Sequence, residues 1–290
     1  MKTMKTKASH PVLPQKPLVI YHGNCADGFS AAWCFWKKFK DDYEYHPGVY
    51  SQKPPDVTNR NVFLVDFSYS REIVADMLTK AKTVTLIDHH ETAIKNLTGL
   101  TGLIQRTSLD KSGAILAWEY VHGTTCPPVL LEYIQDRDLW KFKLALSKEV
   151  NSYVFSHDYS FETWDKLMTL KSPELLSISV AGAAIMRKHE KDVKELVSFS
   201  RRKMTIGGYI VPVANLPYTM ASDAAGEMAT EFPFAATYID TDEHRIFSLR
   251  SRKDSSTWIN VAEIAEGYGG GGHEHASGFR VDRNHPLAKE

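Results

Sequence analysis

The stretch TVTLIDHHE, residues 83–91, runs from β-branched and apolar residues directly into an acid and two histidines. Such a run is typical of a buried strand in a parallel sheet, because both faces of the strand are covered. In open α/β sheets, ligands bind at the carboxyl ends of these strands. Carboxylate and neutral imidazole are natural ligands of divalent metal ions. Asp88, His89 and His90 therefore indicate either a metal site or a polar turn after the strand.

Two earlier segments repeat this arrangement. The strand predicted before His22 leads into a tight turn that contains Asp27, and the strand that begins at Asn61 ends in Asp66. A helical pattern follows each strand, and right-handed βαβ crossovers bring the carboxyl ends of parallel strands to one edge of a sheet. Three such ends in series favour a metal-centred site over three separate polar turns. We expect an α/β fold in which a parallel sheet carries helices on both faces.

The bulk composition excludes several classes of protein. The chain has 290 residues, which is enough for about two domains. Lys+Arg and Asp+Glu both total 35, and this zero net charge argues against a module that wraps duplex DNA. Three cysteines cannot form a disulfide framework, and they fit a reducing compartment. Since no apolar run approaches the roughly 20 residues that span a bilayer, we expect a cytoplasmic protein without a membrane segment.

The patterns divide the chain into four segments. Residues 1–16 are polar and basic and are interpreted as a disordered arm. Residues 17–172 form the domain with the parallel sheet, and residues 173–204 form a long connecting helix. Residues 205–290 form a second, smaller α/β domain, because short strand patterns alternate there with short helical ones.

Three further segments carry candidate ligand contacts. Ser112 begins a small-residue helix whose first amides are either capped or receive an anion. A helix is predicted over residues 129–135. Arg137 follows it, lies between two acids and suits either a phosphate or an ion pair. Residues 269–272 are four consecutive glycines, which we predict to form a loop, neither helix nor strand, whose amides wrap an anion. A flexible linker is the alternative, although His273 follows the glycines directly.

Together these motifs resemble the DHH phosphoesterases of the DHH–DHHA1 subfamily, which includes RecJ exonucleases, nanoRNases and cyclic-dinucleotide phosphodiesterases. The resemblance extends from Val19 to Val281. The segments that carry it are HGNCADG (22–28), VDFS (65–68), DHH (88–90), IQD (134–136), SLRS (248–251) and GGGHEHASGF (270–279). Each segment is weak evidence by itself, but six of them in this order are specific. The resemblance implies a DHH catalytic domain followed by a DHHA1-like substrate-binding domain.

The resemblance also implies a metal cofactor and a role for each matched residue. The first domain would hold two divalent ions, usually Mn²⁺, with Mg²⁺ or Co²⁺ as alternatives. The metal ligands would be His22, Asp27, Asp66, His89 and Asp136. Asp66 would bridge the ions, and Asp88 would orient the site from behind the ligands. The remaining catalytic or substrate-binding residues would be His90 near the scissile phosphate, Arg250 and His273 on phosphate, and Gly270, Gly271 and Gly272 through their amides.

One position departs from the family pattern. Many members have a second Asp two residues before the Asp-Gly pair, where this chain has Cys25. Carboxylate suits Mn²⁺ and Mg²⁺, whereas thiolate prefers softer ions. The departure therefore bears on the occupancy of the first metal site and on the identity of its ion.

These features predict an enzyme of the phosphoesterase class. Two ions about 3.5–4 Å apart activate water for in-line attack on a phosphodiester. The predicted substrate is a short single-stranded oligonucleotide, a linear dinucleotide or a cyclic dinucleotide, and a homodimer is also compatible with the chain. One alternative is an exopolyphosphatase or a pyrophosphatase-like phosphohydrolase. The other is a non-catalytic protein that binds or sequesters nucleotides.

Overall fold

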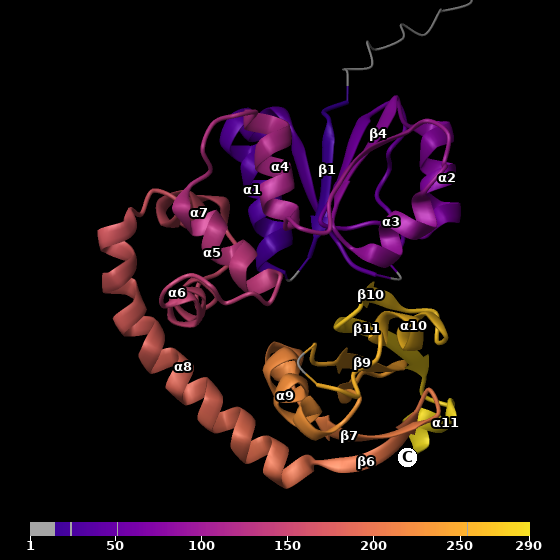
Figure 1. Ribbon diagram of the computed structural model, residues 1–290. Coiled ribbons are helices and arrows are strands. Elements are labelled where there is room, and N and C mark those ends of the chain that lie inside the picture. The colour runs from indigo at the N-terminus through magenta and orange to yellow at the C-terminus, as the bar shows by residue number, and fades with distance from the viewer. Residues whose placement is uncertain (1–14, 24, 51, 254) are drawn as a thin grey trace, which may run out of the picture.

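Two β-sheets form the frame of the protein, one in each half of the chain (Figure 1). The computed structural model describes residues 15–23, 25–50, 52–253 and 255–290. The arm predicted at residues 1–16 therefore lies outside the described residues, apart from its last two positions. Within the described ranges, every helix is either too short or too polar to cross a membrane.

The first sheet has five strands, all parallel. Across the sheet they are β2 (Glu44–Gly48), β1 (Leu18–His22), β3 (Asn61–Val65), β4 (Thr83–Asp88) and β5 (Leu103–Thr107). From β1 the chain passes to β2 on one side and then crosses to β3 on the other. The order thus reverses between β1 and β3, and the carboxyl ends at such a reversal are where open α/β sheets bind ligands.

Helices cover both faces of this sheet, as the alternating pattern predicts. They are α1 (Ala26–Phe39), α2 (Arg71–Lys80), α3 (Glu91–Leu97) and α4 (Gly113–His122). On one face α1 and α4 bury Trp33 and Phe35, and on the other α2 buries Met77 against Leu64. Each such side chain contributes about 1.5–3 kcal/mol when it is fully buried. Two apolar layers therefore hold the strands, and their carboxyl ends are left to polar residues.

A chain of helices leads from the first sheet to the second. Its members are α5 (Val129–Asp138), α6 (Ser147–Val154), α7 (Phe161–Leu167) and α8 (Ser172–Ser200), whereas the short helix η1 (Lys40–Asp42) lies between α1 and β2. The long helix α8 curves from the first sheet's helical layer to the second sheet (Figure 1). It ends at Ser200, before the predicted limit of residue 204, because the chain then enters a strand at Arg202.

The second sheet has six strands and mixed direction, since only β7 and β8 are parallel. In order they are β10 (Gly271–His273), β11 (Ala276–Asp282), β9 (His244–Arg250), β8 (Ala235–Asp240), β7 (Tyr209–Asn215) and β6 (Arg202–Ile206). The helices of this half are η2 (Tyr218–Met220), α9 (Ala221–Met228), η3 (Ala229–Glu231), α10 (Val261–Glu266) and α11 (Pro286–Lys289). Strands β8 and β9 pair antiparallel and form a hairpin.

The glycine-rich segment differs from its prediction as a loop. Gly271 and Gly272 belong to β10, which pairs antiparallel with β11, so that Gly271 faces Gly278. Glycine has little intrinsic preference for strands. The neighbouring strand β11 supplies the hydrogen-bonding partner, and this long-range pairing overrides the local preference.

Candidate metal centre

Three neighbouring strands, β1, β3 and β4, deliver polar side chains to one edge of the first sheet. His22 ends β1, Asp66 follows β3 directly, and His89 follows β4. The Nε2 atom of His89 lies 3.0 Å from Oδ1 of Asp66, and the Nδ1 atom of His22 lies 3.4 Å from Oδ2 of the same carboxylate. The structure thus brings together the strand ends that the sequence predicts to converge.

Asp66 occupies this central place through an unusual backbone conformation. Its φ of 53° lies in the left-handed region, which non-glycine residues rarely adopt. Its amide donates to the carbonyl of Ile87 on β4 at 2.9 Å. Residues held in this region cost about 1–3 kcal/mol and cluster at functional sites. The turn places a carboxylate that is 1% exposed between His22 and His89.

Two glycines allow helix N-termini to approach the cluster. A Cβ atom at Gly28 would lie 2.5 Å from both the Cβ and the carbonyl oxygen of His22. A Cβ atom at Gly113 would lie 2.5 Å from the Cβ of Asp66 and 2.9 Å from Oδ2 of Asp27. No larger residue fits at either position without displacing a site residue. Helix α1 therefore begins directly against His22, and α4 begins directly against Asp66 and Asp27.

The N-terminus of α4 holds Asp27. The amide of Ala114 donates to both oxygens of this buried carboxylate, at 3.2 and 3.3 Å. Ser112, predicted either to cap the helix or to help to bind an anion, is fully buried, and its hydroxyl accepts the amide of Ile115 at 3.5 Å. Since helix N-termini favour negative charge, the anion bound at this one is the side chain of Asp27 itself.

Helix α5 contributes Asp138 to the cluster and directs Asp136 elsewhere. The Oδ2 atom of Asp138 lies 3.4 Å from Nε2 of His89. The two oxygens of Asp136, which was predicted to be a metal ligand, accept the backbone amides of Lys143 at 2.9 Å and Leu144 at 3.1 Å. The structure therefore does not bring Asp136 to the other predicted ligands, because its carboxylate holds the turn after α5.

The spacing within α5 contains a signal for Asp138. The sequence pattern predicts that the helix ends at Gln135, but it continues to Asp138. Ile134 is buried, and Asp138 lies four residues later, one turn along the same face of the helix. Asp136 lies between them and points to a different side. A helix that extends to residue 138 places Asp138, and not Asp136, beside His89.

Asp88 organises the two histidines that follow it. Its Oδ1 atom accepts the amides of His89 at 2.7 Å and His90 at 3.2 Å, and it lies 2.7 Å from Nδ1 of His90. Because a carboxylate only accepts, Nδ1 of His90 carries the proton in this hydrogen bond. The other ring nitrogen, Nε2, is then available to a ligand or to a proton-transfer step.

The second sheet places His273, from β10, over the same cluster. Its ring centroid lies 4.6 Å from that of His90 and 4.8 Å from that of His89. Burial lowers the pKa of His273 to about 2, and the neighbouring His90 and His89 add to this effect. His273 is therefore a neutral imidazole at neutral pH, although it lies beside acidic residues.

The predicted anion-binding glycines already have partners at two amides. The amide of Gly272 donates to the hydroxyl of Thr92, on α3 of the first domain, at 3.1 Å. The amide of Gly270 donates to the carbonyl of Ala265 at 2.8 Å. Gly271 lies between them in β10. The segment thus docks the second domain on α3.

Two arginines lie where α5 faces α9. The guanidinium of Arg250 donates to the hydroxyl of Ser222 and to the carbonyl of Leu249, both at 2.7 Å. Burial and the nearby Arg137 lower the pKa of Arg250 to about 10, so it stays charged at neutral pH. Phosphate binding and an ion pair were the two predicted alternatives for Arg137. In the structure, Arg137 approaches Oδ2 of Asp223 on α9 at 3.9 Å.

Buried polar atoms without hydrogen-bond partners gather in the cluster. They include Nδ1 of His22, Oδ2 of Asp66, Nδ1 of His89 and Oδ2 of Asp138. Donor atoms lie within 4.8 Å of one another in three groups, which are His22–Asp66–His90, Asp27–His89–Asp138 and His89–His90–His273. Unpaired buried polar groups are costly, and divalent cations are bound by this combination of oxygen and nitrogen donors. The residues therefore fit a divalent metal centre.

The pKa values of the cluster indicate a demand for positive charge. Burial raises the pKa of Asp27 well above its usual range, and Asp138 and Asp66 add to the effect. Burial opposes ionisation of Asp66 too, but the adjacent rings of His22 and His89 hold its pKa well below the usual range. The pKa of His89 is raised despite its burial, chiefly because Asp138 and Asp66 lie beside it. Crowded carboxylates of this kind are relieved by bound cations.

Comparisons with known proteins provide similarities without a family assignment. No protein-family model matches the chain. The uncharacterized protein R106 of Acanthamoeba polyphaga mimivirus is 28% identical in an alignment of 291 residues. The alignment covers 91% of this chain and 67% of that protein.

Among solved structures, the pGpG-specific phosphodiesterase PggH from Vibrio cholerae has a TM-score of 0.49 and 17% identity, covering 92% of this chain and 94% of that one. RecJ from Thermus thermophilus, solved in complex with Mn²⁺, has a TM-score of 0.49 and 14% identity, covering 94% of this chain and 51% of that one. Both TM-scores are below 0.5.

Proposed function

We propose that the chain is a divalent-metal-dependent phosphodiesterase that hydrolyses short single-stranded oligonucleotides or dinucleotides. One observation carries the proposal. Carboxylates and imidazoles from the ends of β1, β3 and β4 and from α1 and α5 converge at one sheet edge. Several of their buried polar atoms lack hydrogen-bond partners, and His273 reaches them from the second domain. The motifs that resemble those of DHH phosphoesterases contribute several of these same residues.

The proposed metal ligands form two adjoining sets. One set contains His22 and Asp66, and the other contains Asp27, His89 and Asp138. The two sets meet where Oδ1 of Asp66 lies 3.0 Å from Nε2 of His89. Asp66 is therefore placed to serve both sets. When bound, divalent ions, with Mn²⁺ expected from the resemblance, supply activation of water and neutralisation of phosphate charge.

His90 is the residue best placed to move a proton. Asp88 holds Nδ1 of His90 and thereby fixes the ring. The free Nε2 atom can then exchange a proton with the leaving oxygen of the substrate, a contribution that is typically worth about 10²–10⁴-fold in rate. Neutral His273 can donate one N–H group to a phosphoryl oxygen. Arg250 supplies a fixed positive charge that stabilises the negative charge that builds up on the phosphoryl group.

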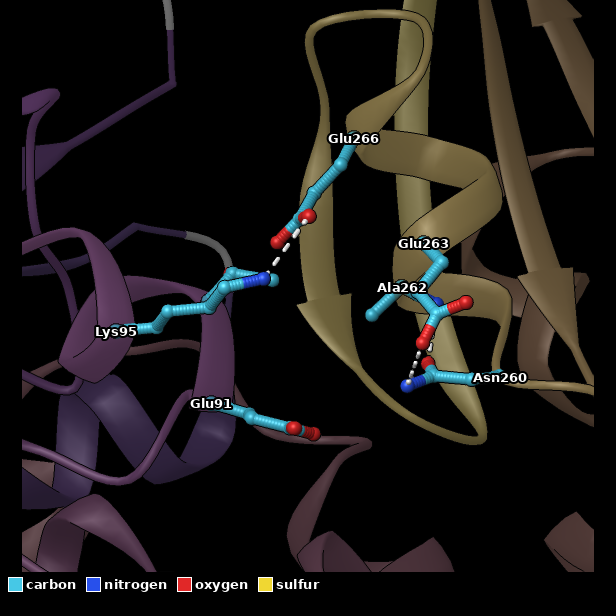
Figure 2. Close-up of a pocket in the computed structure, with 7 residues that line it drawn as sticks. Glu91, Lys95, Asn260, Ala262, Glu263 and Glu266 are labelled. Atoms are coloured by element: carbon cyan, nitrogen blue, oxygen red, sulfur yellow. Dashed lines mark hydrogen bonds and ion pairs between the residues drawn. The ribbon is translucent and has the colours of Figure 1, made fainter.

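A small cavity at the domain junction is rich in acidic residues, which supports the approach of phosphate from another side. It has a volume of about 50 Å³, lies between α3 and α10, and is lined in part by Glu91, Glu263 and Glu266 (Figure 2). Lys95 extends from α3 toward Glu266, with 3.6 Å between Nζ and Oε2. The three carboxylates outnumber this single cation. Phosphate groups would therefore avoid this side and approach from the side of the two arginines, between α5 and α9 (Figure 1).

Aromatic side chains near the arginines favour a nucleotide as the substrate. The guanidinium carbon of Arg137 lies 5.8 Å from the ring centroid of Trp140, which is 47% exposed. Tyr159 and Tyr218 are 40% and 63% exposed, and the charge of Arg137 acts on Tyr159. Stacking of a base on an aromatic ring is worth about 1–3 kcal/mol. Polyphosphate would gain nothing from these rings, which favours the nucleotide over the exopolyphosphatase alternative.

A substrate screen tests the proposal. Chelator-treated protein would be given Mn²⁺ and linear pNpN dinucleotides, longer RNA and DNA oligomers, cyclic dinucleotides or polyphosphate, and the products would be separated by chromatography. We expect mononucleotides from the short linear substrates. The rate of their release should fall strongly in His90→Ala and stay unchanged in the remote control His244→Ala. Preferential cleavage of polyphosphate would support the phosphohydrolase alternative. Tight nucleotide binding without turnover would support sequestration.

A further inference from the structure

We propose that Asp223, on α9, is a positioning residue that ties the second domain to the first and holds Arg137 beside Arg250 before the substrate arrives. The inference rests on the proposed function and names the contact that sets how the two domains close on a phosphodiester. In this role Asp223 acts through Arg137.

One carboxylate oxygen of Asp223 joins three helices. Its Oδ2 atom accepts a hydrogen bond from Nε2 of His189 on α8 at 2.8 Å, because a carboxylate can only accept. The same oxygen lies 3.9 Å from Nη2 of Arg137 on α5. Helix α5 belongs to the first domain, α8 connects the domains, and α9 belongs to the second, inside the curve of α8 (Figure 1). The contact with Arg137 therefore crosses from one domain to the other.

The connecting helix α8 is fastened on both sides of this contact. Toward its start, Gly182 packs so closely on α6 that a Cβ atom there would lie 1.8 Å from the carbonyl oxygen of Glu149. Toward its end, Val193 packs in one apolar cluster with Ala224 of α9. Movement of one domain against the other has to bend α8 between these attachments, and the ion pair beside His189 opposes that movement.

The first turn of α9 holds both arginines. Nη2 of Arg250 donates to the hydroxyl of Ser222 at 2.7 Å, and Asp223 is the next residue. Burial, together with the charge of Arg137, lowers the pKa of Arg250 to about 10, whereas the charges of Asp223 and Asp138 oppose this shift. Two like charges in proximity repel each other, so the arginines need a counter-charge before a phosphate arrives. Asp223 supplies that charge from the turn that also binds Arg250.

The contact between Asp223 and Arg137 is suited to exchange. A separation of 3.9 Å is long for an ion pair, and the two side chains are 38% and 27% exposed, so the pair contributes little to folding. Arg137 has a second support, because its guanidinium carbon lies 4.5 Å from the ring centroid of Phe155. This ring can keep the guanidinium in place while a substrate phosphate replaces the carboxylate, since guanidinium geometry matches phosphate. The hydrogen bond with His189 meanwhile keeps Asp223 on α8.

Loss of the Asp223 carboxylate has a characteristic kinetic consequence. The docked arrangement would be less populated before the substrate binds, and apparent affinity falls by the fraction of molecules that are competent to bind. Once the substrate is bound, its own phosphate holds the arginines, so turnover at saturation is preserved. The signature of the role is therefore a raised KM with an unchanged kcat.

Kinetics and solution scattering together test the inference. The linear dinucleotide pApA and Mn²⁺ would be given to the wild type, to Asp223→Asn and to the control Glu227→Gln, whose side chain is exposed on the same helix. We expect Asp223→Asn to raise KM by about fivefold or more and to change kcat by less than about twofold. It should also increase the radius of gyration of the substrate-free protein in small-angle X-ray scattering. Glu227→Gln should match the wild type in all three quantities.

A double variant tests whether Asp223 acts through Arg137. In an Arg137→Gln background, Asp223→Asn should raise KM no further, because the contact that it weakens is already absent. Circular dichroism would verify that each variant is folded. A further increase in KM equal to that in the wild-type background would overturn the assignment of Arg137 as the partner.

The possible failures are distinguishable. An equal KM and an equal radius of gyration for Asp223→Asn and Glu227→Gln would overturn the positioning role and leave the proposed function intact. A fall in kcat at unchanged KM would also overturn it, because Asp223 would then act in the chemical step. Absence of hydrolysis by the wild type would overturn the proposed function. The radius of gyration alone would then decide whether Asp223 ties the domains, with an increase supporting the tie and an unchanged value refuting it.

Discussion

The Nδ1 atom of His90 lies 2.7 Å from Oδ1 of Asp88, and the same oxygen accepts the backbone amides of His89 and His90. One buried carboxylate thus fixes two consecutive imidazoles at the end of β4. In the proposed enzyme, these imidazoles have different tasks, because His89 faces the acids and His90 keeps Nε2 free. Asp88 acts as the positioning residue for both.

Replacing Asp88 with Asn should separate positioning from folding. The variant keeps the size of the side chain but weakens its hold on the ring of His90, so we expect kcat to fall by about 10–100-fold. Steady-state kinetics with a dinucleotide substrate would measure this fall. Asp56→Asn is the control, because Asp56 also accepts a backbone amide, that of Thr58 at 3.0 Å, in an exposed turn. Equal kinetics for the two variants would contradict the role of Asp88.

Asp138 and Asp136 should respond in opposite ways to the same substitution. Asp138→Asn removes a donor oxygen next to His89, so metal binding and activity should fall sharply, whereas stability should hold because fewer buried carboxylates repel one another. Asp136→Asn weakens the two backbone hydrogen bonds that hold the turn after α5. It should cost about 1–3 kcal/mol in the free energy of unfolding. Calorimetric metal titration and urea denaturation of both variants distinguish these outcomes, and the reverse pattern would restore Asp136 as the ligand.

The sequence predicts three of the five strands of the first sheet, β1, β3 and β4, because the residues of these strands carry two signals. The residues before Asp66 and Asp88 are runs of apolar and β-branched residues, and each run stops at an acid. β2 escapes this reading because it contains Pro47 and ends in Gly48. It is nevertheless a strand at the sheet edge, paired only with β1, where proline is tolerated.

The site is predictable where a ligand follows a strand and less so where a helix or a domain contact positions it. His22, Asp66 and His89 come from strand ends, whose direction the topology fixes. Asp138 depends on three additional residues of helix at the end of α5, which the local sequence does not require. The position of His273 depends on how the second domain docks on the first, and no local pattern encodes that packing.

Domain docking through Thr92 should affect turnover more than metal binding. The hydroxyl of Thr92 accepts the amide of Gly272, next to His273. Thr92→Val removes this acceptor and should disfavour the docked arrangement by about 1 kcal/mol, lowering kcat/KM roughly fivefold. Thr92→Ser retains the hydroxyl and should behave like the wild type. A loss of metal affinity in Thr92→Val, or equal kinetics for all three proteins, would contradict the docking role.

The stability of the second domain should depend on pH through Asp240. Hydrogen bonds from Arg245, assisted by Arg283 and opposed by partial burial, lower the pKa of Asp240 from 3.8 to about 2. The stabilisation is therefore fully present above pH 4 and is lost as the pH falls from 3.8 through about 2. Since the side chain of Asp240 is 31% exposed, we expect about 1 kcal/mol at most.

Urea denaturation of the wild type and of Asp240→Asn would measure this contribution. The difference in unfolding free energy should stay constant between pH 6 and pH 4 and shrink at lower pH, as long as both proteins remain folded. Asp242→Asn, in the same exposed turn, should show no such dependence. A difference that grows as the pH falls would refute the assignment to Asp240.

The most direct test of the metal-centred account is the hydrolysis of one linear pNpN dinucleotide by chelator-treated protein before and after addition of Mn²⁺, with Asp66→Asn run in parallel. The account predicts no product before addition, mononucleotides after addition, and at least about 10²-fold slower release by Asp66→Asn, because this carboxylate serves both ligand sets. Product formation that is independent of added metal, or an Asp66→Asn variant as fast as the wild type, would contradict it.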